Sequence, residues 1–185
     1  EKVLCYMTIG DNDIILAIRG RTEKGFRLLM LKYKQPIYWH IRRLVVTHDD
    51  AQDATQETFI RIFRSFDKFK NDKSFRSWIF RIATNEALRL IASRKQERTS
   101  LEEDEHEANN IIADDYVDYT NLEAVKLQQA VQSLPTKQQL VFNLRYYDEL
   151  SYEEIAEVTE STPAAAKMNF HIAKEKIIKY INETN

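Results

Sequence analysis

The sequence predicts an all-α protein in which two helical domains are joined by a flexible acidic linker. Only 3 Gly and 3 Pro occur in 185 residues, so few positions can interrupt helices or form β-turns. Apolar residues recur at helical spacing in both halves of the chain. Charge is distributed unevenly: residues 1–98 carry 20 Lys and Arg against 12 Asp and Glu, residues 99–122 carry none against 8, and residues 123–185 carry 7 against 9. This distribution predicts three separate segments.

The composition is that of a soluble globular protein, with 43% hydrophobic and 30% charged residues. No apolar run approaches the roughly 18–20 residues of a membrane span, and no signal peptide begins the chain. The single cysteine, Cys5, lies in a poorly patterned N-terminal tail, residues 1–10, and cannot form an internal disulfide. A cytoplasmic location is therefore expected.

Residues 11–98 are predicted to form a four-helix bundle. One helix follows Ala51, because its apolar residues fall at positions i, i+3, i+4 and i+7; these are Phe59, Ile62, Phe63 and Phe66. A polar break at Lys70–Lys73 precedes another helix, for which Ser74 is the predicted N-cap. Two upstream periodic stretches, residues 14–31 and 37–46, supply the other helices.

Residues 99–122 are predicted to be a flexible linker. The segment contains only scattered apolar residues and cannot bury enough surface to offset the entropy of ordering. A second interpretation is an acidic strand that mimics DNA and occupies a basic channel of a partner. The sequence does not distinguish the two.

Residues 123–185 have the pattern of a helix-turn-helix domain. Pro135 begins a helix that extends to about Tyr147. Ser151–Glu154 has the sequence of a capping box and predicts a short helix. Thr162 as N-cap and Pro163 as the first helical residue then predict a final helix to about residue 181.

The final helix is the predicted DNA-reading element, because the second helix of this motif lies in the major groove. Lys167, Asn169 and His171 are the candidate base readers, and Lys174 and Lys176 are placed nearer to phosphates. The alternative is a solvated basic face on a core helix.

The helix before it carries four acids that would repel DNA if they faced it: Glu153, Glu154, Glu157 and Glu160. Weak DNA affinity of this domain alone is expected, so a second protein should hold it on DNA.

The segment Lys68–Arg98 interleaves basic and aromatic side chains, a combination that suits single-stranded nucleic acid. The alternative for its aromatic residues is a place in the core. The four His have no ligand-spaced partners, and no phosphate-binding loop or nucleophile motif occurs. We therefore expect no catalysis, no metal, no cofactor and no small-molecule substrate.

Three motifs in order resemble the extracytoplasmic-function sigma factors of the sigma-70 family. Asp50–Phe59 and Phe75–Asn85 are similar to signatures of the family's second region, and Leu150–Glu157 is similar to one of its fourth region. The resemblance covers residues 11–98 and 122–181. It implies binding to core RNA polymerase, recognition of the −10 and −35 promoter elements, and promoter melting by capture of a flipped base.

The resemblance also implies residue roles. Core polymerase would be bound by Asp53, Gln56, Glu57 and Ile60. The melted −10 element would be bound by Phe69, Lys70, Asn71, Lys73, Arg76, Arg81 and Asn85. The double-stranded −35 element would be bound by Thr162, Ala164, Lys167, Met168, Asn169, His171 and Lys174. An anti-sigma factor is an implied partner, and membrane insertion is not expected.

Several positions depart from the family pattern. Arg89 stands where Asp is usual, Ala92 and Ser93 replace basic residues, and Ile172 replaces a common Arg. Glu160 replaces the usual Gly between the last two helices, at a cost on the order of 1 kcal/mol if that residue is left-handed.

Two other classes of protein remain as alternatives. A helix-turn-helix regulator would bind duplex DNA tightly without polymerase, which the near-neutral C-terminal segment disfavours. A helical adaptor would bind only protein, and Lys167→Ala and Asn169→Ala would then leave promoter recognition intact. An enzyme is the least favoured class.

Overall fold

The computed structural model describes residues 9–20, 23–45, 47–70, 74–100 and 122–183, with backbone alone for 95–100. These residues form eight α-helices and a short 3-10 helix, and they contain no strand. The predicted all-α class is confirmed. Most of the N-terminal tail, with Cys5, and nearly all of the predicted linker lie outside the described residues.

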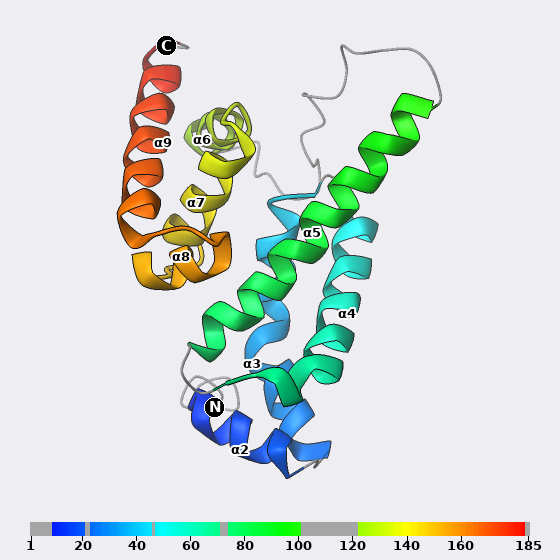
Figure 1. Cartoon of the computed structure of the whole chain (residues 1–185). Coiled ribbons are helices and arrows are strands. Elements are labelled where there is room, and N and C mark those ends of the chain that lie inside the picture. Colours follow the sequence, from blue (N-terminus) through cyan, green and yellow to red (C-terminus); the bar gives the residue numbers. More distant parts are fainter. Residues whose placement is uncertain (1–8, 21–22, 46, 71–73, 101–121, 184–185) are drawn as a thin grey trace.

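Four α-helices make up the N-terminal module (Figure 1). They are α2 (Asp11–Arg19), α3 (Glu23–Arg42), α4 (His48–Ser65) and α5 (Phe75–Ser100), with the 3-10 helix η1 (Phe66–Lys68) between the last two. The predicted boundaries of the first two helices, 14–31 and 37–46, are wrong. The chain leaves α2 at Gly20, whereas Pro36 lies inside α3. Burial of Tyr33, Ile37 and Ile41 along α3 offsets the cost of an interior proline.

Helices α2 and α3 approach each other closely at Gly25. A Cβ atom at this position would lie 2.5 Å from the main-chain carbon of Ala17. Only glycine permits this approach, so backbone packs directly against backbone at this crossing.

The C-terminal module contains α6 (Leu122–Gln132), α7 (Thr136–Tyr146), α8 (Tyr152–Thr159) and α9 (Pro163–Glu183). Both predicted helix starts are confirmed. The main-chain N–H of Glu154 donates to Ser151 Oγ at 3.2 Å, and that of Ala165 donates to Thr162 Oγ1 at 3.1 Å. Between α8 and α9, Glu160 is left-handed with φ 51°, as expected where the family has glycine. Helices α8 and α9 form the predicted helix-turn-helix.

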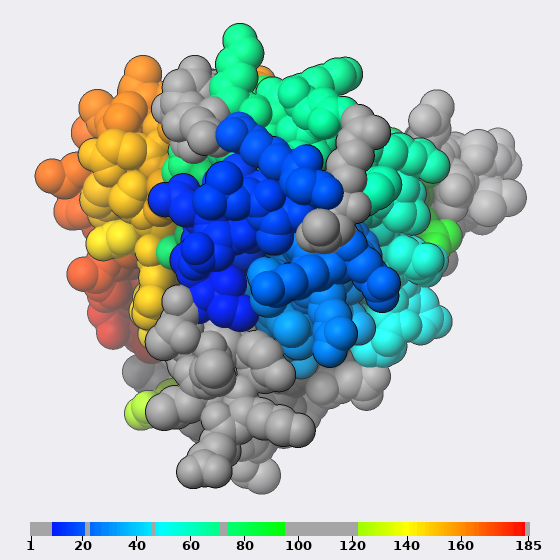
Figure 2. Space-filling view, turned by 90° about the horizontal axis from the view of Figure 1, so that it is seen from below, coloured from blue at the N-terminus to red at the C-terminus, as the bar shows by residue number. Residues whose placement is uncertain are grey.

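The two modules lie against each other, and α8 packs beside the N-terminal part of α5 (Figure 1). Figure 2 shows the C-terminal module alongside the N-terminal one in a second direction of view. Buried residues of α8 and its preceding loop, such as Leu150 and Ile155, belong to the same hydrophobic core as Ile37 of α3 and Phe80 of α5. A second, smaller core lies among α6, α7 and α9.

Candidate functional site

Helix α9 presents most of its predicted DNA-reading residues to solvent. Ala166, Ala173 and Ile177 are buried and hold the helix against its own module. Six of the seven predicted −35 residues are exposed; these are Thr162, Ala164, Lys167, Met168, His171 and Lys174. The exposed residues lie on one surface that no other described element covers, as a reading helix requires.

Some polar side chains of α9 already have partners within the protein. Asn169 is partly buried and donates from Nδ2 to the carbonyl of Ala165 at 2.9 Å. His171 Nε2 lies 3.3 Å from Glu175 Oε1. Lys176, also considered for phosphate contact, donates to Gln138 Oε1 at 3.0 Å. Of the polar readers, Asn169 therefore has one of its two amide N–H groups occupied by a main-chain carbonyl.

The predicted −10 residues gather around the start of α5. Lys70 and Asn85 are exposed, whereas Asn71 and Lys73 lie outside the described residues. Arg76 donates to the main-chain carbonyl of Asp148, and Arg81 forms an ion pair with Glu160. Both arginines therefore contact the C-terminal module in this structure.

Phe69 does not fit the predicted DNA contact, because only 7% of its surface is exposed. Its ring lies 5.1 Å from that of Trp78 and 5.2 Å from that of Phe75, measured between centroids, and Phe66 adjoins the same cluster. The aromatic residues of this segment are core, which was the alternative interpretation. Phe69 packs against the first turns of α5.

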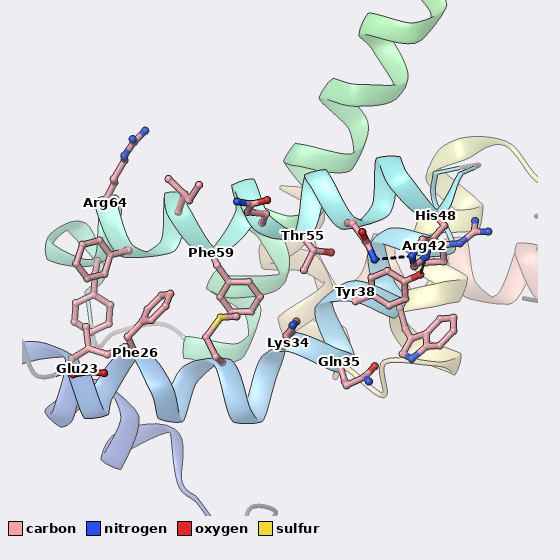
Figure 3. A pocket seen from close by; sticks show the side chains of 18 of the residues that line it. Glu23, Phe26, Lys34, Gln35, Tyr38, Arg42, His48, Thr55, Phe59 and Arg64 are labelled. Atoms are coloured by element: carbon pink, nitrogen blue, oxygen red, sulfur yellow. Dashed lines mark hydrogen bonds between the residues drawn. The ribbon is translucent and has the colours of Figure 1, made fainter. Parts of the chain in front are cut away.

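A long groove runs between α3 and α4 (Figure 3). Its volume of about 1740 Å³ exceeds the roughly 300–1,000 Å³ of small-molecule pockets, so it fits a segment of a macromolecule better than a metabolite. At one end Tyr38 Oη lies 2.7 Å from His48 Nδ1, and at the other the rings of Phe26 and Phe63 meet edge to face.

The groove includes part of the predicted polymerase-binding set. Gln56 and Ile60 line it. Asp53 is exposed on α4, the helix that carries both residues. Glu57 Oε1 forms an ion pair with Arg61 Nε at 3.2 Å. Sequence reasoning missed the groove because it placed Phe63 in the buried stripe, whereas 65% of Phe63 is exposed.

Arg89, one of the departures from the family pattern, has a structural partner. It forms an ion pair with Glu86, one helical turn earlier, and Arg61 of α4 lies 2.5 Å from the other oxygen of the same buried carboxylate. The two arginines neutralise Glu86 between α4 and α5. Arg89 is therefore explained by packing of the N-terminal module.

A buried polar cluster between the modules also escaped sequence reasoning. Asp148, before α8, accepts a hydrogen bond from His40 Nδ1 of α3 at 2.8 Å and forms an ion pair with Arg43, the residue directly after α3. His40 Nε2 lies 2.9 Å from Thr84 Oγ1 of α5. Burial alone would raise the pKa of Asp148. The positive charges of His40 and Arg43, and the hydrogen bonds that these residues donate, outweigh the effect of burial and hold that pKa below its usual value.

No group of three or more His, Cys, Asp or Glu among the described residues is arranged to hold a metal ion. No described helix combines the length and apolar character that crossing a membrane requires.

An exposed helix-turn-helix surface, a basic module beside it and a groove of macromolecular size define a two-domain helical nucleic-acid-binding protein. Two family models match the chain: Sigma-70 region 2 over residues 29–98 and Sigma-70, region 4 over residues 124–177. The chain belongs to the sigma-70 family of RNA polymerase sigma factors, in its extracytoplasmic-function group.

Curated relatives support this membership. The chain is 28% identical to RNA polymerase sigma-H factor of Pseudomonas aeruginosa over 178 residues, which is 91% of this chain and 92% of that protein. It is 28% identical to ECF RNA polymerase sigma-E factor of Escherichia coli K12 over 176 residues, 90% of this chain and 92% of the relative.

Solved structures share the fold. The sigma factor RpoE of Bartonella quintana, in complex with the anti-sigma factor NepR, aligns with a TM-score of 0.72 and 21% identity over 86% of this chain and 98% of that one. CnrH in complex with the cytosolic domain of CnrY aligns with a TM-score of 0.69 and 20% identity over 95% and 100%.

Proposed function

We propose that this protein binds core RNA polymerase and directs it to promoters by recognising −10 and −35 elements and assisting promoter melting. The observation that carries the proposal is the exposed basic face of α9, joined in one chain to a basic N-terminal module, in the order of sigma regions 2 and 4. The protein acts where the polymerase acts, in the cytoplasm, and needs neither catalysis of its own nor a cofactor.

Residues 11–98 form the unit for core polymerase and the −10 element, residues 123–185 form the unit for the −35 element, and residues 99–122 connect them. The groove between α3 and α4 supports polymerase docking, because Gln56 and Ile60 line a surface of macromolecular size. Opening DNA costs a few kcal/mol per flipped base, and a basic surface prearranged on the polymerase can supply this energy without ATP.

On α9, exposed Lys167 is the first candidate for a base contact, with Thr162 and Lys174 at either end of the reading surface. On the N-terminal module, the described residues proposed to bind the melted −10 strand are Lys70, Arg76, Arg81 and Asn85. An anti-sigma factor is a further proposed partner, since the structural relative RpoE from Bartonella quintana is seen in complex with the anti-sigma factor NepR.

A run-off transcription assay with purified core polymerase and genomic promoter fragments tests the proposal. Added protein should produce transcripts from defined sites, and the Gln56→Ala/Ile60→Ala variant should lose core binding by about tenfold or more, since central interface residues contribute at least 1–2 kcal/mol each. Gln132→Ala, an exposed glutamine on α6, is the matched control and should initiate normally. Wild-type protein that fails to bind core polymerase would overturn the proposal.

The promoter contact has its own test. Lys167→Ala should lower initiation from cognate promoters and relax selection at one −35 position, by about 1–3 kcal/mol of discrimination. Lys179→Ala, an exposed lysine near the end of the same helix, serves as control. Tight and specific binding of duplex DNA without polymerase would favour the alternative of an independent helix-turn-helix regulator.

A further inference from the structure

Three acids in α8 or directly after it contact α5 or the residue that precedes α5; Glu154 and Glu157 are partly buried, and Glu160, the residue after α8, is exposed. Ser74 Oγ donates to Glu154 Oε1 at 2.8 Å, Ser77 Oγ donates to Glu157 Oε2, and Arg81 forms an ion pair with Glu160. These partners are separated by 80, 80 and 79 residues, so the two helices run in the same direction and in register. The acids, about one helical turn apart, form a single carboxylate row along α5.

The loop before α8 adds a buried contact to this row. The Asp148 carboxylate, whose residue is 7% exposed, is bound by His40 and Arg43, and Arg76 of α5 donates to the Asp148 carbonyl. Each of these side-chain partners belongs to the N-terminal module. The Asp148 carboxylate therefore stabilises the docking of the two modules rather than the fold of its own.

Apolar burial extends the same contact. Leu150 and Ile155 are fully buried and share the hydrophobic core of the N-terminal module, together with Val158. Separation of the modules would expose these side chains to water. The contact thus has an apolar centre, a buried ion cluster at one end and a partly exposed row of acids along its length, which are the components of a specific interface.

The arrangement competes with DNA. Arg76 and Arg81 are bound by the Asp148 carbonyl and the Glu160 carboxylate, so these contacts compete with contacts to phosphates. The carboxylates of Glu154, Glu157 and Glu160 lie along the face of α5 where the phosphates of a bound DNA strand would lie. Their negative charge would repel those phosphates. We propose that α8 and Asp148 hold the free protein in a closed, autoinhibited state, in which the acidic row covers the surface of α5 that binds the melted −10 strand.

The closed state is inhibitory only if the proposed function holds, and it then sets the order of polymerase docking and DNA binding. Gln56 is exposed, and with Ile60 it lines the groove between α3 and α4, so polymerase can dock while the modules are closed. Opening must then precede capture of the −10 strand. The acids of α8, unfavourable on a DNA-binding domain, acquire a role as the inhibitory surface.

Distance measurement on the free full-length chain tests the closed state without reference to transcription. Spin labels are placed at Lys24→Cys on α3 and Lys179→Cys on α9, both exposed, in a Cys5→Ser background. We expect one narrow distribution of distances for the otherwise wild-type chain and a broad, longer one for the opened variant Asp148→Asn/Glu157→Gln/Glu160→Gln. A wild-type distribution as broad as that of the opened variant would overturn the inference.

The matched control removes three charges from the same module without touching the contact. It is Glu123→Gln/Glu149→Gln/Glu153→Gln, whose three acids are all exposed. It should keep the narrow distribution. Far-UV circular dichroism checks helix content. The Glu157→Gln/Glu160→Gln variant, altered at one partly buried and one exposed position, provides a second opened form that retains Asp148.

Binding to a labelled single-stranded oligonucleotide of randomised sequence tests the masking. If the closed state leaves about a tenth of the molecules open, the opened variant should bind about tenfold tighter, and the charge-matched control should bind as the wild type does. Equal affinity of the opened variant and the control would overturn the masking. The run-off assay is a separate readout: a chain that initiates with core polymerase yet fails both tests retains the proposed function and loses only the closed state.

Discussion

At the scale of single residues, two left-handed glutamates shape the surroundings of α8. Glu149 has φ 55° and Glu160 has φ 51°, and neither is glycine. The left-handed conformation costs free energy at both turns. The turn at Glu149, before α8, directs the neighbouring Asp148 toward His40 of α3. The turn at Glu160, after α8, directs the Glu160 side chain toward Arg81. Backbone strain at these two turns therefore coincides with the contact between the modules.

Glu149→Gly should stabilise the protein by about 0.5–1 kcal/mol, because glycine adopts a positive φ without the steric cost of a Cβ atom. The Glu149 side chain is exposed, so little packing is lost. Urea unfolding of the full-length chain measures the difference. Glu153→Gly, in the first turn of α8, is the control and should destabilise by up to about 1 kcal/mol. The same sign for both variants would contradict this explanation.

At the scale of elements, α8 has only eight residues and depends on its ends and its neighbours. An isolated helix of this length is unstable in water. Glu154 serves twice: its Oε2 accepts from the main-chain N–H of Ser151 at 3.0 Å, and its Oε1 accepts from Ser74. The capping box that begins the helix is therefore continuous with the contact to α5.

Ser151→Ala should lower the free energy of unfolding by about 1 kcal/mol, because the main-chain N–H of Glu154 loses its capping acceptor. Ser151→Thr keeps a hydroxyl at the same place and should lose much less. Urea unfolding monitored by circular dichroism compares the two variants. An equal loss for both would show that the hydroxyl does not carry the effect.

Which element features were predictable from sequence depended on how local their causes are. The caps at Ser151 and Thr162 involve neighbours three residues away, and both were predicted. The division of residues 14–42 into helices was predicted wrongly. Gly20 ends α2 within a stretch whose apolar periodicity continues, whereas Pro36 lies inside α3 and does not end it. Periodicity also placed Phe63 inside; only the packing of α3 against α4 shows it in the groove.

At the scale of the whole molecule, the order of the two helical modules follows from the sequence, but their contact does not. His40 and Asp148 are 108 residues apart, and nothing near either one signals the other. The exposed face of α9 was predictable from the turn that precedes it. The engagement of Arg76 and Arg81 was not, because their partners become neighbours only when α8 packs against α5.

Acid should weaken this contact between modules, and Asp148 sets the direction. Its carboxyl pKa is lowered in the folded protein, since His40 and Arg43 outweigh the effect of burial. A lowered pKa means that the stabilisation is fully present above the ordinary value of about 3.9 and is lost as pH falls through the lowered one. The groups that face this carboxylate are His40 of α3 and Arg43 directly after that helix, with Arg76 of α5 on the adjoining carbonyl.

The difference in free energy of unfolding between wild type and Asp148→Asn isolates this contribution. We expect it to be about 3–5 kcal/mol near neutral pH, since Asp148→Asn leaves the largely buried Arg43 guanidinium without its carboxylate and removes the charged acceptor of the His40 hydrogen bond. It should stay constant down to about pH 5 and then shrink as the wild-type carboxylate takes up a proton. Urea unfolding over this range measures it, with Glu153→Gln as the exposed-acid control. A difference that grows on acidification would show that the pKa of Asp148 is raised, not lowered, in the folded protein and that the cluster does not hold the modules together by charge.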